Sequence, residues 1–198
     1  MDHKKLLILF LSYQIGYNAI EGNTMNFFGY IESVDYSIFL DINQDITNPF
    51  FDNFFPLLRD ITYFFWIFLI VYFWVKKEKR LAMVMTTGII AGAVFTYPLK
   101  FLIDRQRPYE QIESTRLLTP FENDPSFPSG HTEMSFLAAT IITRFHPGYG
   151  KYLYAFSFIV ALSRIYVGVH FPIDVIGGAI IGIIIGRLTL RNNLSKMD

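Results

Sequence analysis

Long apolar runs separated by short polar stretches dominate the pattern of hydrophobic and polar positions along this chain. A helix that crosses a bilayer needs about 20 mainly apolar residues. Six runs approach this length once their flanking residues are included: Leu6–Ile20, Ile61–Val75, Leu81–Leu99, Thr132–Thr143, Tyr152–Val169 and Phe171–Gly186. The pattern therefore predicts an all-α, polytopic membrane protein with six transmembrane helices. Its 198 residues are expected to form a single membrane-embedded domain.

The segment Gly22–Asp60 has a different pattern, because acidic residues are mixed there with aromatic and apolar ones. Its members are Asp35, Asp41, Asp45 and Asp52 together with Phe39, Leu40, Phe50, Phe51, Phe54 and Phe55. Such a mixture is typical of an amphipathic segment that lies in the membrane interface with its rings at headgroup depth. We predict an interfacial segment here, and an ordinary extramembrane loop is the alternative.

Composition favours a membrane protein over a soluble one. Hydrophobic residues make up 52% of the chain and charged residues 17%, whereas soluble domains carry about 25% charged residues. The formal net charge is zero, so no basic excess points to nucleic acid. Cysteine is absent, which excludes disulfides and cysteine zinc sites. A soluble bundle with unusually apolar helices is disfavoured by the very short loops between adjacent runs.

Lysine and arginine are unevenly distributed between the two sides of the predicted spans. With six spans, one side receives Lys4, Lys5, Lys76, Lys77, Lys79, Arg80, Arg144, Lys151, Arg187, Arg191 and Lys196. Basic residues accumulate on the cytoplasmic side of membrane proteins. We therefore expect both termini to be cytoplasmic, in the cytoplasmic (plasma) membrane, and the opposite side to face outward.

Three polar clusters fall on this outward side, within a core at residues 81–190. The first is KFLIDRQRP, from Lys100 to Pro108, at the end of the third run. The second is PSGH, from Pro128 to His131, and it opens the fourth run. The third is SRIYVGVHFPID, from Ser163 to Asp174, between the last two runs. Ionisable residues at the ends of spans are costly, so a functional role is expected.

The side chains in these clusters are suited to binding a phosphate. Lys100, Arg107 and Arg164 supply three cations, and a guanidinium group forks onto phosphate oxygens with two parallel bonds. Ser129 and Gly130 precede a predicted helix, whose free N–H groups and dipole favour an anion. Each motif alone is also explained by an anchoring arginine, a helix cap or a structural hydrogen bond. Their coincidence on one side favours an anion site.

Two histidines and a carboxylate supply the chemistry for phosphoryl transfer. Pro172 predicts the start of the last helix, which places Asp174 in its first turn, within reach of His170. A neutral His170 oriented by Asp174 fits a nucleophile. His131, beside the phosphate-binding turn, fits a general acid. A metal site made of His131, His170 and Asp174 is an alternative, but the three nearby cations oppose a divalent ion.

These residues resemble the three-part motif of the type 2 phosphatidic acid phosphatase superfamily, K-x6-R-P, P-S-G-H and S-R-x5-H-x3-D. Every fixed position matches between Lys100 and Asp174, while the first hundred residues match only in general layout. The resemblance implies that His170 forms a phosphohistidine, that Asp174 orients it and that His131 protonates the leaving alcohol. It assigns phosphate binding to Lys100, Arg107, Ser129, Gly130 and Arg164. It also implies six spans, a site at the outer leaflet, and neither metal nor cofactor.

The expected function is that of a lipid phosphatase that removes the terminal phosphate of a phospholipid or polyprenyl (di)phosphate. Undecaprenyl or another polyprenyl diphosphate and phosphatidylglycerophosphate are the favoured substrates. A lipid phosphotransferase would use the same phosphohistidine, and a catalytically inactive lipid-binding scaffold could keep the same fold. The apolar spans disfavour a soluble haloperoxidase of the same superfamily. We expect the loop Tyr109–Phe127 to influence headgroup choice.

Overall fold

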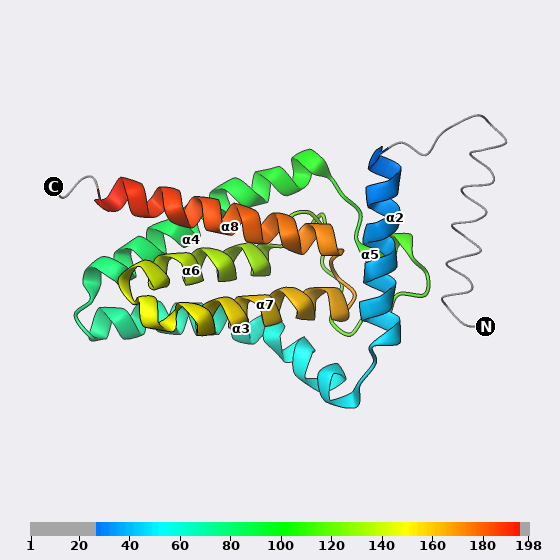
Figure 1. Cartoon of the computed structure of the whole chain (residues 1–198), viewed down its shortest axis with the longest axis horizontal. Coiled ribbons are helices and arrows are strands. Elements are labelled where there is room, and N and C mark those ends of the chain that lie inside the picture. The colour runs from blue at the N-terminus through cyan, green and yellow to red at the C-terminus, as the bar shows by residue number, and fades with distance from the viewer. Residues whose placement is uncertain (1–26, 195–198) are drawn as a thin grey trace.

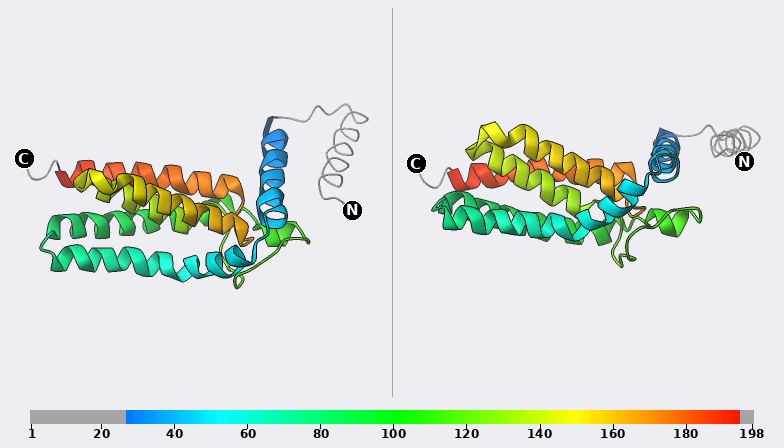
Figure 2. Two further views of the ribbon diagram at one scale, coloured as in Figure 1. Left: turned by 60° about the horizontal axis from the view of Figure 1, so that its bottom comes forward. Right: turned by 90° about the horizontal axis from the view of Figure 1, so that it is seen from below.

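The computed structural model describes residues 27–194, and every regular element in this part of the chain is helical. Five long helices run side by side along the long axis of the molecule, and the views in Figures 1 and 2 agree on this arrangement. They are α3 (Pro49–Val75), α4 (Lys79–Ile103), α6 (Gly130–Phe145), α7 (Gly150–Tyr166) and α8 (Pro172–Leu194). The all-α fold class is therefore confirmed.

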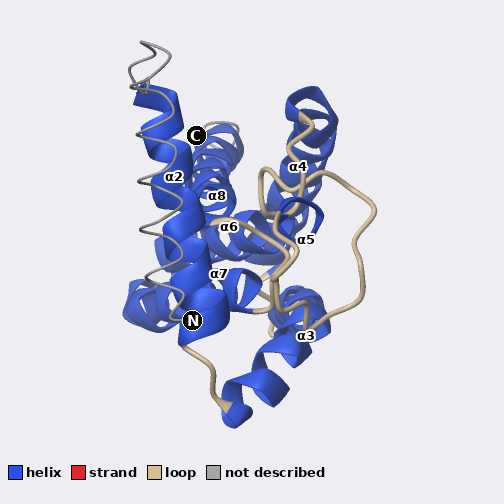
Figure 3. Ribbon diagram, turned by 90° about the vertical axis from the view of Figure 1, so that its right-hand side faces the viewer, coloured by secondary structure: helices blue, strands red, loops and turns tan. Residues whose placement is uncertain are grey.

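The shorter elements gather mainly at one end of this bundle. Helix α2 (Phe27–Leu40) lies across that end, and a π-helical turn, Asp41–Asp45, connects it towards α3. The short helix α5 (Pro108–Gln111) is at the same end, and Figure 3 shows it below α4 when the molecule is viewed from that end. A 3-10 turn, Pro147–Tyr149, joins α6 to α7 at the other end. The end that carries α2 and α5 is called the site end below, and the opposite end is called the far end.

Five of the six predicted spans coincide largely with the five bundle helices. Three helical segments are long and apolar enough to cross a bilayer, at 49–75, 79–111 and 172–192. Helices α6 and α7 are shorter, with 16 and 17 residues. The first predicted span, Leu6–Ile20, lies outside the described residues. The count of six spans therefore stays a prediction.

Helix α3 begins well before the predicted start of its span. Asn48 caps it, because its side-chain oxygen accepts a hydrogen bond from the Phe50 amide at 2.8 Å, and Pro49 occupies the first helical position. Residues 49–60, which the sequence pattern placed in the interfacial segment, thus continue the helix. Pro56 lies inside α3 and cannot donate to the hydrogen-bond ladder. The ribbon bends towards α2 in this part of the helix (Figure 1).

Glycines let the central helix α6 pack closely against α8. Gly178, Gly182 and Gly186 repeat at intervals of four along α8, and a side chain at any of them would crowd the backbone of α6. Small residues at this spacing allow two helix backbones to approach. The Ser129 amide also donates to the Asp174 carbonyl oxygen at 3.0 Å. The N-terminus of α6 is thereby held against the N-terminus of α8, where two of the sequence motifs lie.

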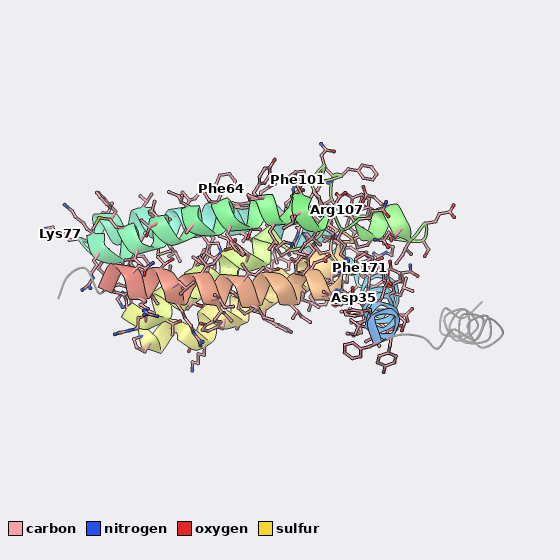
Figure 4. All side chains as sticks on the ribbon, turned by 90° about the horizontal axis from the view of Figure 1, so that it is seen from above. Asp35, Phe64, Lys77, Phe101, Arg107 and Phe171 are labelled. Carbon is pink, nitrogen blue, oxygen red and sulfur yellow. The ribbon has the colours of Figure 1, made fainter. Side chains whose placement is uncertain are left out.

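Many large apolar side chains point away from the bundle. Phe64 on α3 and Phe101 on α4 are 72% and 51% exposed, and Figure 4 shows both on the outside of the helices. A soluble protein rarely exposes apolar surface so extensively. These outer faces suit contact with lipid, while the packed interior contains Trp66, Leu137 and Ile141.

Candidate active site

All eight residues singled out from the sequence lie at the site end of the bundle. Each of them lies at the end of a helix or within two residues of one. Lys100 is in the last turn of α4, Arg107 caps α5, Ser129 caps α6, Gly130 and His131 begin α6, Arg164 is in the last turn of α7, and His170 and Asp174 flank the start of α8. Figure 4 shows Arg107 at this end and Lys77 at the far end.

His170 is almost completely enclosed, with 1% of its surface exposed. Its Nδ1 atom lies 3.5 Å from Asp174 Oδ2 and 3.3 Å from Ser126 Oγ. Its Nε2 atom lies 3.5 Å from Arg107 Nη1. Burial lowers the pKa of His170 to about 4, and nearby Arg107 acts in the same direction while Asp174 opposes it. The imidazole is therefore neutral near pH 7, as a nucleophile must be.

Asp174 is held by donors from three other residues. Its Oδ2 atom accepts hydrogen bonds from Ser126 Oγ at 2.5 Å and from the Phe171 amide at 2.8 Å. Its Oδ1 atom pairs with Arg105 Nη1 at 2.6 Å. A carboxylate with so many donors is fixed in position, so it can fix the imidazole beside it. The sequence analysis assigned no role to Ser126 or Arg105.

Arg105 connects this carboxylate to helix α2. Its Nη2 atom pairs with Asp35 Oδ2 at 2.5 Å, and its guanidinium group lies 4.4 Å from the centre of the Phe171 ring. Asp35 Oδ1 also accepts the Ile173 amide at 2.8 Å. The signal that marks Asp35 is its spacing of four from Phe39, since both are buried on the same face of α2. Figure 4 shows Asp35 and Phe171 close together at the site end.

The three predicted phosphate-binding cations are buried and paired with two carboxylates of one loop. Lys100 Nζ lies 3.0 Å from Asp124. Arg107 pairs with Asp124 and with Glu122, each at 2.8 Å. Arg164 pairs with Glu122 at 2.7 Å. Glu122 and Asp124 thus occupy the positions where the oxygens of an anion would be bound. The sequence analysis placed both in the loop expected to influence headgroup choice, but it did not predict that they pair with the three cations.

The charges in this cluster control the ionisation of the two carboxylates. Burial acts to raise the pKa of Glu122, but Arg164 and Arg107 outweigh it and hold the pKa below its ordinary value. Burial likewise acts to raise the pKa of Asp124, and Lys100 and Arg107 reverse the effect. Both carboxylates are therefore ionised near neutral pH. Their charge balances cations that would otherwise be buried without partners.

Arg164 retains donors that the described part of the chain leaves unpaired. Its side chain is fully buried, and its Nε and Nη1 atoms have no hydrogen-bond partner among the described residues. Buried donors are almost always satisfied in folded proteins. Arg164 therefore has hydrogen-bonding capacity for a ligand in addition to Glu122.

His131 lies at the edge of the same site. Its Nε2 atom lies 3.0 Å from the Arg59 carbonyl oxygen, which can only accept, so Nε2 carries the proton of this bond. Its ring centre is 4.5 Å from that of Tyr63. Ser129 Oγ accepts a hydrogen bond from Thr132 Oγ1 at 3.1 Å. No group of three metal-ligating side chains occurs among residues 27–194, so His131, His170 and Asp174 are not arranged as one.

A cavity of about 400 Å³ connects these groups with the interior of the bundle. It lies among α3, α4 and α6. Its polar end is lined by Lys100, Glu122, Asp124, Gly130, His131 and His170, and its apolar part by Ile89, Ala93 and Met134. A cavity that is charged at one end and apolar at the other suits a molecule with a phosphate head and a hydrocarbon tail.

Comparison with known proteins adds a family and a fold. A family model described as the PAP2 superfamily matches residues 81–197. Undecaprenyl-diphosphatase BcrC of Bacillus subtilis (strain 168) is 36% identical over 117 residues, which are 59% of this chain and 59% of that protein. The matches to the first curated relatives cover 57% to 64% of the length of those proteins.

Two solved structures share the arrangement of helices. The crystal structure of Aquifex aeolicus LpxE has a TM-score of 0.73 at 31% identity, over 80% of this chain and 95% of that one. The transmembrane PAP2-type phosphatidylglycerolphosphate phosphatase of Bacillus subtilis has a TM-score of 0.65 at 24% identity, over 100% of this chain and 98% of that one. With its long apolar helices, this chain is a multi-pass membrane protein. The family model covers more than half of its length, and the chain therefore belongs to the PAP2 superfamily.

Proposed function

We propose that this protein is a lipid phosphatase that transfers the terminal phosphate of its substrate first to His170 and then to water. The observation that carries this proposal is the position of His170, which is buried and neutral between Asp174 and Arg107. It also lines a cavity whose other part is apolar. Nucleophile, orienting carboxylate and anion-binding cation are the three parts that such a transfer needs.

The first chemical step forms a bond between His170 Nε2 and phosphorus as the bond from phosphorus to the lipid oxygen breaks. Asp174 holds the Nδ1 side of the ring and stabilises the positive charge that the ring acquires. The leaving oxygen takes a proton from His131, which must then carry a second proton on the nitrogen that does not bond to Arg59. Burial and nearby Arg164 lower the pKa of His131, so the negative charge of the bound substrate must stabilise this second proton. In the second step, water attacks phosphorus and gives a proton to His131, while the bond from phosphorus to His170 Nε2 breaks and returns its electron pair to the ring, which frees phosphate.

The buried cations stabilise the charge that spreads over the phosphate oxygens during both steps. Arg107 and Arg164 are bonded to Glu122 in the ligand-free arrangement, and Lys100 to Asp124. The substrate phosphate takes over these bonds, together with the unpaired donors of Arg164. Charged donors positioned before the reaction begins are the largest single source of rate in such sites. No step requires a metal ion.

Undecaprenyl or another polyprenyl diphosphate and phosphatidylglycerophosphate are the substrates that we favour. The likeness to the undecaprenyl-diphosphatase of Bacillus subtilis supports the first of them. The charge distribution supports an outward-facing site, because Lys76 and Lys77 in the connection between α3 and α4, and Lys79 and Arg80 at the start of α4, lie at the far end. Since the chain has no cysteine, single cysteines at Lys77 and Glu113 can be labelled with an impermeant maleimide to test this orientation.

The test of the activity is phosphate release by the purified protein in detergent, with EDTA present. The panel contains undecaprenyl diphosphate, phosphatidylglycerophosphate and phosphatidic acid. His170→Ala should abolish release. His146→Ala is the matched control, because His146 pairs with Glu78 at the far end. Activity of His170→Ala near that of the wild type would refute the nucleophile.

The same experiment separates hydrolysis from transfer to a second lipid. Rapid quenching should trap phosphate on the wild-type protein in an acid-labile form, and His170→Ala should trap none. A phosphotransferase would show the trapped phosphate but release it only after an acceptor lipid is added. Absence of both trapping and release for every lipid would reject the proposed function.

A further inference from the structure

Two buried polar side chains face the cavity below the phosphate site without a partner. Glu133 on α6 and Thr96 on α4 are each 4% exposed, and both line the cavity. Glu133 Oε1 and Thr96 Oγ1 have no hydrogen-bond partner among the described residues. Among the other buried carboxylates, Asp35 and Asp174 are both paired with Arg105. Glu133 therefore differs from them, because its Oε1 atom is left for a ligand to bind.

The packing around Glu133 provides space for its carboxyl group. A side chain at Gly92 would collide with Glu133 Oε1, so α4 can accept the carboxyl group only because residue 92 is glycine. Gly92 and Thr96 are four residues apart, which places them on the same face of α4. The carboxyl group of Glu133 and the hydroxyl group of Thr96 thus lie along one wall of the cavity.

This wall lies below the phosphate-binding end of the cavity. Thr96 lies one helical turn below Lys100, and Gly92 lies two turns below it, or about 12 Å along the axis. The neighbouring walls are Ile89, Ala93 and Met134, which offer no hydrogen bonds. Leaving a carboxyl group and a hydroxyl group unsatisfied there is costly. A polar group of the substrate, just beyond its terminal phosphate, would remove this cost.

We propose that Glu133 and Thr96 form a subsite for a hydroxyl group of the substrate, so the chain acts on lipids with a polyol next to the terminal phosphate. The subsite rests on the proposed function, because it takes the leaving group of the same reaction. A hydroxyl group can exchange hydrogen bonds with the carboxyl group of Glu133 and with the hydroxyl group of Thr96.

The two favoured substrates differ at this position. Phosphatidylglycerophosphate carries a glycerol hydroxyl group beside its terminal phosphate. A polyprenyl diphosphate has a second phosphate there, followed by hydrocarbon. That second phosphate offers only acceptors, so it leaves the accepting oxygen of the Glu133 carboxyl group without a donor. The subsite therefore selects the glycerol-type lipid over the diphosphate.

The test compares phosphatidylglycerophosphate with an analogue in which hydrogen replaces the free glycerol hydroxyl group. The wild-type protein should prefer the hydroxylated lipid in kcat/KM by about tenfold, because the analogue leaves buried polar groups without a hydrogen-bond partner. Thr96→Val and Glu133→Met should each reduce this preference towards one. Thr86→Val is the matched control on α4, because Thr86 donates to the Ala82 carbonyl oxygen away from the cavity. It should keep the full preference.

Two results would overturn the subsite. One is an equal preference in wild type, Thr96→Val and Glu133→Met. The other is a wild-type protein that does not distinguish the two lipids. Thr96→Val preserves the shape of the side chain, so it keeps the test valid if Glu133→Met fails to fold.

Binding separates this proposal from the proposed function. His170→Ala should bind the hydroxylated lipid more tightly than the analogue, measured by the thermal shift of the full chain in detergent. Absence of phosphate release from every lipid, with this difference intact, would reject the phosphatase and retain the subsite. Phosphate release, together with equal affinities and equal kcat/KM values for the two lipids, would reject the subsite and retain the phosphatase.

Discussion

The two ends of the helical bundle contain the same kinds of charged residue in opposite settings. At the site end, Arg107 and Arg164 are buried and pair with carboxylates that come from another segment of the chain. At the far end, Lys76 and Lys79 are exposed, and the contacts of their ammonium groups are with the rings of Tyr72 and Trp74, at 5.8 and 5.7 Å. Figure 4 shows this separation through Arg107 and Lys77.

This contrast shows that burial and pairing, more than residue type, distinguish a recognition site from a topological signal. An exposed lysine is hydrated and screened, so its interaction with any one partner is weak. A buried arginine with an ionised partner has lost its hydration shell and instead makes charge-assisted hydrogen bonds to that partner. Another anion can take the place of the partner. Four experiments test this difference between the two ends.

Loss of one buried cation should have the largest effect. Arg107→Gln removes a donor close to His170 and leaves Glu122 and Asp124 with one partner fewer. We expect kcat/KM to fall by about 10²- to 10³-fold, as for other donors that stabilise transition-state charge. Arg80→Gln at the far end should change it less than about twofold. Losses of similar size in both variants would contradict the distinction between the two ends.

The acid limit of activity should be shifted far below that of an ordinary histidine. His170 is neutral above its pKa of about 4, so only at lower pH does protonation remove the nucleophile. We expect kcat/KM to fall about tenfold per pH unit below this value and to stay level, for this group, up to neutral pH. The profile must be corrected for ionisation of the substrate. An acid limb near pH 6.5 would show that His170 is not desolvated.

Removing the charge that α2 supplies should have an intermediate effect. Asp35→Asn keeps an acceptor for the Ile173 amide but removes the carboxylate that pairs with Arg105. Arg105 then holds Asp174 less firmly, and we expect kcat to fall about tenfold with little change in KM. Glu32→Gln on the same helix is the control, because Glu32 is exposed and accepts a hydrogen bond from the Tyr36 hydroxyl group, away from Arg105. A rise in KM with unchanged kcat would argue against a positioning role.

Breaking an ion pair at the far end should have the smallest effect. Glu78 and His146 are 2.7 Å apart, with side chains 39% and 30% exposed. Solvent screens such a pair, so Glu78→Gln should cost less than about 1 kcal/mol of stability and leave activity unchanged. The midpoint of unfolding in detergent measures the first quantity. A loss as large as that of Arg107→Gln would show that the far end is also a functional region.

The sequence predicted the eight site residues because they lie in three short motifs with regular spacing. It did not predict Arg105 or Ser126, which lie beside the motifs at variable positions. Their roles depend on Asp174, which is 69 residues from Arg105 and 48 from Ser126 along the chain. Asp35 lies in a segment read as interfacial, 70 residues from Arg105. Contacts between residues so far apart along the chain form when the helices pack together, so no local sequence pattern predicts them.

Local sequence therefore determined which segments form helices, where α8 begins, and which side chains we propose for the phosphate-binding and acid–base chemistry. These properties follow from hydrophobic periodicity, from proline and capping residues, and from the functional groups themselves. Only the tertiary structure decided that Glu122 and Asp124 neutralise the cations and that Arg105 connects α2 to Asp174. It also decided that Glu133 and Thr96 face the cavity without a hydrogen-bond partner among residues 27–194. The reason is physical: burial and pairing set the energy of a charge, and both depend on segments that are distant along the chain.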